Sequence, residues 1–130
     1  KGQIVDTFVY YMGELLTGKG PAFTILLLFI FITILNFFVD SGSGKAVMMM
    51  PIMSPLGKIL GINQQVMVMT YQFGDGFTDY LWPAGALVPC QLCGLKYNIW
   101  LKFAARAMTI QLAAGYIMVL IAHYINLGPF

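Results

Sequence analysis

Charged residues are what this sequence has least of. Only 9% of its 130 residues are charged and 59% are hydrophobic, whereas an ordinary soluble domain has about 25% charged residues. A soluble fold of this size could not bury so much apolar surface. The scarcity of charge therefore argues against a soluble protein. It predicts an all-α integral membrane protein, with the lipid bilayer as its main partner.

Basic clusters and metal ligands are also scarce. The net charge is only +2, and no basic block alternates with aromatic residues, so we expect no nucleic-acid partner. Cys90-Gln-Leu-Cys93 lacks the second pair or neighbouring histidine that a tetrahedral zinc site needs. We interpret Cys90 and Cys93 as small residues in a helix and His123 as an interfacial side chain. A membrane redox protein that uses the two cysteines is a third alternative, and we expect no enzyme activity.

The residues on either side of Gly44-Lys45 exclude a nucleotide site. A phosphate-binding loop needs Ser or Thr after its lysine to bind magnesium, and a glycine five residues before the second glycine. Ala46 and Val39 occupy those positions here. The glycine-rich stretch therefore requires another explanation.

Long hydrophobic runs are present, but two of them are interrupted. A run without charge over residues 22–39 has about the length of a membrane-spanning helix. Apolar sequence resumes after the stretch Ser41-Gly-Ser-Gly-Lys45, and a second interruption, Gly74–Asp79, divides another apolar segment. In chain order, we expect an amphipathic interfacial helix over 3–16, apolar halves over 22–39 and 46–60, an interrupted helix over 64–93 and a final span over 107–125.

The lengths of the interrupted elements leave the topology partly open. The second element would be about 36 Å of helix, which suits one crossing. The first pair would be about 50 Å, so it must tilt, project from the bilayer or form two separate spans. If each element crosses once, Lys19 shares a side with Lys96, Lys102 and Arg106. The positive-inside rule then makes that side cytoplasmic and places the C-terminus outside.

The two interruptions are the best candidates for a binding site. Irregular backbone at membrane depth is tolerated only where it is buried in protein or lines a wet cavity. Half-helix N-termini attract anions, and interrupted hydrophobic segments are typical of secondary transporters. The alternative for the first interruption is a surface loop between two ordinary spans. The candidate substrate- and ion-binding residues are Ser41, Gly42, Ser43, Gly44 and Lys45 in the first interruption, and Gly74, Asp75, Gly76, Thr78 and Asp79 in the second.

Within this set, we expect Ser41, Ser43 and nearby backbone to contact substrate or cation, and Lys45 to act as the counter-charge. Ionisable groups inside a membrane usually serve function. A sodium ion near Ser41, Ser43 and Thr78 is the one candidate cofactor.

Three stretches of the sequence resemble a known family of bacterial carriers, and the resemblance covers nearly the whole chain in order. The family is the YfcC/DcuC group, the four-carbon-dicarboxylate anaerobic carriers and their relatives in the ion transporter superfamily. The stretches are Asn36-Phe-Phe-Val-Asp-Ser-Gly-Ser-Gly-Lys-Ala46, Met50-Pro-Ile-Met-Ser-Pro-Leu-Gly57 and Tyr71-Gln-Phe-Gly-Asp-Gly-Phe-Thr78.

The resemblance implies an elevator-type secondary carrier of the bacterial cytoplasmic membrane, built from two inverted repeats and usually dimeric. It implies that residues 22–60 form one tilted, broken crossing with its break at 41–45. Gly74–Asp79 would lie in the next helix of the same mobile domain. One departure lies in the candidate site: the group usually has Asn where this chain has Asp79.

These inferences combine into one expectation. The chain is the C-terminal portion of a multi-pass secondary transporter for an organic anion (dicarboxylate-like) or amino acid, coupled to sodium or protons. The missing half, or a partner subunit, would complete the site, so the chain is a fragment, a split subunit or a degenerate copy, in a homodimer or larger complex. The alternative is a small non-transporting membrane subunit. The expected parts are an interfacial helix and linker over 1–21, two broken transmembrane helices of the transport domain over 22–93, and an interfacial linker with the last span over 94–130.

Overall fold

A computed structural model describes residues 10–11, 13–14, 18–39 and 41–128, and this part of the chain is helical and contains no strand. The amphipathic helix expected over residues 3–16 lies largely outside the described residues. The helices are α2 (Pro21–Phe38), α3 (Gly42–Ile59), α4 (Gln64–Gly76), α5 (Pro83–Leu92) and α6 (Tyr97–Tyr124).

The helix ends follow local sequence rules. Pro21 and Pro83 occupy the first turns of α2 and α5, where the missing N–H of proline costs nothing. The Ser41 hydroxyl caps α3 by accepting a hydrogen bond from the Gly44 N–H at 3.2 Å. The Asn63 side chain caps α4 in the same way, through the Gln65 N–H at 2.8 Å. The expected break over 41–45 is therefore wrong for residues 42–45, which form the first turn of α3, because the Ser41 cap satisfies one of the free N–H groups of that turn.

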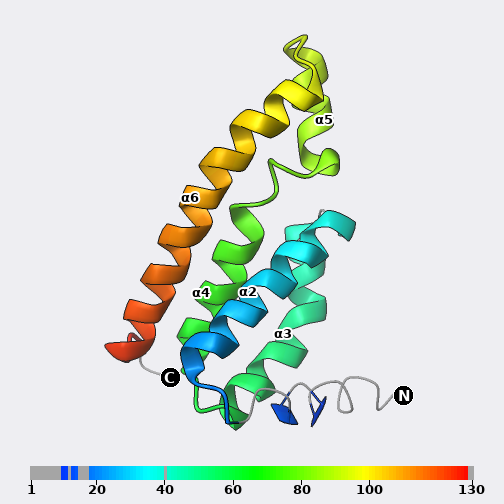
Figure 1. The fold of residues 1–130 in the computed structure, drawn as a ribbon. Coiled ribbons are helices and arrows are strands. Elements are labelled where there is room, and N and C mark those ends of the chain that lie inside the picture. Colours follow the sequence, from blue (N-terminus) through cyan, green and yellow to red (C-terminus); the bar gives the residue numbers. More distant parts are fainter. Residues whose placement is uncertain (1–9, 12, 15–17, 40, 129–130) are drawn as a thin grey trace, which may run out of the picture.

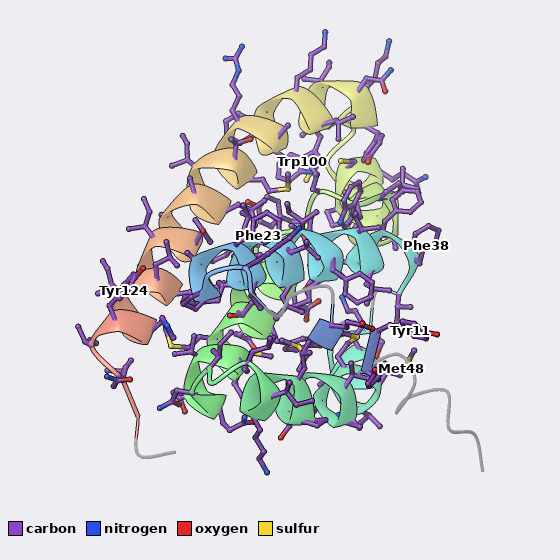
Figure 2. All side chains as sticks on the ribbon, turned by 60° about the horizontal axis from the view of Figure 1, so that its bottom comes forward. Tyr11, Phe23, Phe38, Met48, Trp100 and Tyr124 are labelled. Carbon is purple, nitrogen blue, oxygen red and sulfur yellow. The ribbon has the colours of Figure 1, made fainter. Side chains whose placement is uncertain are left out.

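The chain reverses direction between α2 and α3. Both views show α2 and α3 running in nearly opposite directions, with the end of α2 beside the start of α3 (Figures 1 and 2). The single broken crossing expected for residues 22–60 is therefore wrong. The physical reason is that both helices pack against α4, which a straight continuation of α2 would not permit.

The second interrupted element has the expected form, with a later break. α4 and α5 point in the same general direction in Figure 1, and α6 returns alongside them. However, α4 continues through Gly74 and Gly76, and the irregular segment covers 77–82. It ends at Pro83, which starts α5. α4 lies at the centre of the bundle and packs against α2, α3 and α6.

The reversal changes the distribution of positive charge. The start of α2 and the end of α3 lie at the same end of the bundle as the end of α6, whereas the α5–α6 turn lies at the other end (Figure 1). Lys19 just before α2 and Lys58 in the last turn of α3 therefore share an end. Lys96, the residue that precedes α6, lies at the opposite end. The expected grouping of Lys19 with Lys96 is wrong.

α2 and α6 are long and apolar enough to cross a membrane. Within their most apolar stretches, only 33% of α2 and 17% of α6 are buried inside the chain. Phe38 and Tyr124 project outward at the edges of the bundle (Figure 2). The large exposed apolar side chains on these two helices include Phe23, Ile30, Ile34, Phe37, Phe103, Ile110, Ile117 and Ile121. Such surfaces suit lipid or further transmembrane helices.

Replacing Gly74 with leucine is expected to destabilise the bundle. A Cβ at Gly74 would lie 3.2 Å from the Ile32 side chain and 3.4 Å from the Phe29 carbonyl, so α2 would have to move away from α4. Overpacking of this kind costs about 1–3 kcal/mol. Gly76→Leu is the matched control, since Gly76 is exposed and its Cβ would meet only the Gln72 side chain, at 3.8 Å. Thermal unfolding of the two variants in detergent should separate them, and equal melting temperatures would contradict the close approach.

Candidate functional site

A cluster of buried polar side chains lies where the α2–α3 reversal meets the end of α4. The buried polar and charged members are Asn36, Lys45, Asp75 and Thr78, each at most 5% exposed. Asn36 comes from the last turns of α2, Lys45 from the first turn of α3, and Asp75 from the last turn of α4. Burying charge is costly unless it is paired, so the contacts of these groups decide what the site can do.

Lys45 is the positive centre of this cluster. Its ammonium donates a hydrogen bond to Asn36 Oδ1 and forms an ion pair with the Asp75 carboxylate. The second carboxylate, Asp79 Oδ1, lies 3.6 Å from the Lys45 ammonium nitrogen. Lys45 is thus placed between two carboxylates, and its expected role as a counter-charge in solute binding stays a prediction.

Asn36 links the reversal to the second break. Its Nδ2 lies 2.9 Å from the Asp75 carbonyl oxygen, 2.6 Å from Thr78 Oγ1 and 2.7 Å from Asp79 Oδ1. The Thr78 hydroxyl lies 3.0 Å from the Gly74 carbonyl oxygen, to which it can donate. Asn36 was not among the predicted site residues. Its sequence signals were an amide in an uncharged run, where membrane helices rarely carry polar groups without a role, and its place at the start of the first stretch that resembles the carrier family.

Tyr71 is a second residue that the sequence did not single out. Its hydroxyl donates to the Gly42 carbonyl across 2.7 Å, which ties the start of α3 to α4. A Cβ at Gly42 would lie 3.3 Å from Asp75 Oδ2. The absence of a side chain at Gly42 therefore lets the backbone of α3 approach the Asp75 carboxylate closely.

The predicted site residues divide into two groups. The structure brings together Gly42, Lys45, Asp75, Thr78 and Asp79. The other residues lie around this group: Ser41 caps α3 and is exposed, Ser43 is exposed, Gly44 lies against Ser41, Gly74 packs against α2, and Gly76 is exposed. Whether these ten residues bind substrate, and whether sodium lies near Ser41, Ser43 and Thr78, stay predictions.

Comparison with known proteins adds the family. The family model described as DcuC, C4-dicarboxylate anaerobic carrier, matches residues 1–124. A protein of Escherichia coli (strain K12) named "Putative basic amino acid antiporter YfcC" is 32% identical over 119 residues, which cover 90% of this chain. An uncharacterized protein of Haemophilus influenzae is 34% identical over 123 residues, which cover 93% of this chain. No solved structure matches.

The matched region covers only 24% of the length of each of these two relatives. The family match nevertheless extends over almost the whole chain. It includes both breaks and all the helices described above, and it agrees with the resemblance seen in the sequence. The chain belongs to the C4-dicarboxylate anaerobic carrier (DcuC) family of membrane transporters.

Proposed function

We propose that this chain supplies part of the solute-binding centre of a secondary active transporter for an organic anion or an amino acid, coupled to sodium or protons. The observation that carries the proposal is the network of the buried Lys45, Asn36 and Asp75 with the half-exposed Asp79. It forms where two interruptions of apolar helices meet. The family description and the name of the E. coli relative support transport and leave the substrate open.

The energetics of the network favour a functional role. A buried ion pair contributes little net stability, because desolvation of both charges offsets their attraction. Apolar residues of similar volume would serve the fold at least as well. Charges that are kept at the meeting point of three helix ends are therefore best explained by a solute or ion that must be recognised there.

The α3 N-terminus adds a second element of recognition. Ser41 and Ser43 are exposed at this end, where the helix dipole favours a negative group such as a carboxylate. Lys45 lies in the first turn of the same helix. A carboxylate-bearing solute is thus the substrate class that the residues of the first break support.

The setting of the proposed carrier follows from the same features. We place it in the bacterial cytoplasmic membrane, with the end that carries Lys96, Lys102 and Arg106 inside and the C-terminus outside. The remaining part of the site would come from the rest of the protein or from a partner subunit. A dimer agrees with the large apolar surfaces of α2 and α6.

Uptake by the complete gene product, reconstituted in proteoliposomes, tests the proposal. Succinate, L-aspartate and L-lysine serve as labelled solutes, with and without sodium and proton gradients. Asp75→Asn should lower uptake at least about tenfold, because it leaves the buried Lys45 charge without its close partner. Ser41→Ala combined with Ser43→Ala should also lower uptake, through loss of the exposed hydroxyls at the α3 N-terminus.

Glu14→Gln is the control for charge removal, since Glu14 is exposed and lies outside the cluster. Uptake that survived both the serine pair and Asp75→Asn would refute the proposal. It would favour the non-transporting subunit instead.

A further inference from the structure

The charges of the site do not balance. Asp75 and Asp79 contribute two negative charges and Lys45 contributes one positive charge. Among the described residues, Lys45 is the one cation within ion-pair distance of either carboxylate. The part of the site that the described residues form therefore carries one excess negative charge.

The excess charge belongs to Asp79. The Asp75 side chain is 8% exposed and forms the closer ion pair with Lys45. The Asp79 side chain is 45% exposed, and the Lys45 ammonium lies 3.6 Å away. Its other partner is the neutral Asn36 amide at 2.7 Å. Asp75 is thus occupied by Lys45, whereas Asp79 is accessible and only partly neutralised.

We infer that Asp79 binds a positive charge delivered by the transported solute or by its coupling ion, so the carrier selects for a monovalent cationic group. A carboxylate that is only partly neutralised attracts an opposite charge, and the attraction is stronger where less water surrounds the pair. Both an organic ammonium group and a sodium ion meet this requirement. The inference rests on the proposed function and narrows it: an amino acid, or an anion accompanied by sodium, fits better than a dicarboxylate alone.

The direction in which one substitution changes the affinity for ligand tests the inference. Asp79→Asn removes the charge but keeps an oxygen that can accept from the Asn36 amide. If Asp79 binds a cation, Asp79→Asn weakens ligand binding. If the site takes only an anion, Asp79→Asn removes a repelling charge and strengthens binding. Asp79→Glu keeps the charge, and Glu14→Gln removes an exposed charge elsewhere.

The experiment measures ligand affinity of the purified complete gene product by thermal shift and by tryptophan fluorescence. Trp82 is a natural reporter, because its ring lies 5.1 Å from that of Phe37, the neighbour of Asn36 in α2. The probes are sodium chloride at constant ionic strength, L-lysine, and the pair L-aspartate and succinate in sodium-free buffer. Aspartate and succinate differ by one ammonium group, so this pair isolates the role of the positive charge.

The expected result is that sodium or an ammonium-bearing probe binds the unaltered protein, and that Asp79→Asn weakens this binding at least about tenfold. Asp79→Glu and Glu14→Gln should retain it. The sodium and amine arms identify which source supplies the cation. Binding of succinate alone that is tighter in Asp79→Asn overturns the inference. Cation binding that is absent, or is unchanged in Asp79→Asn, also overturns it.

This result is separable from the uptake test of the proposed function. If Asp75→Asn lowers uptake but Asp79→Asn leaves cation binding unchanged, only the inference about Asp79 is refuted. If uptake is unchanged both in Asp75→Asn and in the Ser41→Ala, Ser43→Ala variant, the proposed function is refuted, whatever Asp79 binds.

Discussion

Replacing Lys45 with methionine is expected to abolish uptake and to lower the free energy of unfolding by about 3–5 kcal/mol, the usual cost of leaving a buried charge unpaired. Lys45 is 2% exposed and is held between Asn36, Asp75 and Asp79. Methionine keeps the length and the helix propensity of the side chain. The loss of stability and of uptake would therefore result from the missing charge, because the Asp75 carboxylate stays buried without its cationic partner.

A double-mutant cycle separates stability from function at this pair. Asp75→Asn in the Lys45→Met background removes the orphaned carboxylate, so much of the lost melting temperature should return while uptake stays abolished. Thermal unfolding in detergent and uptake in proteoliposomes provide the two measurements. Additive losses of stability in the double variant would show that Lys45 and Asp75 do not form the buried pair. Recovery of uptake would show that neither charge serves transport.

Replacing Asn36 with leucine is expected to cost about 3 kcal/mol of unfolding free energy and to reduce uptake strongly. Asn36 is fully buried, accepts from Lys45, and lies within hydrogen-bond distance of Thr78, Asp79 and the Asp75 carbonyl. Leucine has a similar volume, so little packing is lost. Each buried group left without its partner costs about 1–3 kcal/mol, and more where it is charged.

Thr33→Val is the matched control for Asn36→Leu. Thr33 lies in the same helix, and its hydroxyl donates only to the Phe29 carbonyl of the preceding turn, across 2.9 Å. Loss of that local bond should change the unfolding free energy by no more than about 1 kcal/mol. Equal melting temperatures for Asn36→Leu and Thr33→Val would contradict the bridging role of Asn36.

That the apolar sequence has two interruptions could be predicted from local composition, but the first was expected at 41–45, whereas residues 42–45 form the first turn of α3. Local chemistry also sets the helix starts: Ser41 and Asn63 cap α3 and α4, and Pro21 and Pro83 lie in the first turns of α2 and α5. Lys45, Asp75 and Asp79 were conspicuous as charges in an apolar sequence. The second break was expected at Gly74–Asp79 and lies at 77–82 instead. The reason is that Gly74 serves the close packing of α4 on α2 rather than ending the helix.

By itself the sequence determined that this is a helical membrane protein of one transporter family, with charged residues in or beside two interruptions. Composition and local propensity are sufficient to identify a helical membrane protein. The motifs around the interruptions are sufficient to identify the family. Only the tertiary structure decided that the chain reverses after α2, that Asn36 joins the two breaks, and that Asp79 is half-exposed where Asp75 is buried. These features depend on contacts between residues distant in sequence, above all on how α2 and α3 pack against α4, and no local pattern encodes them.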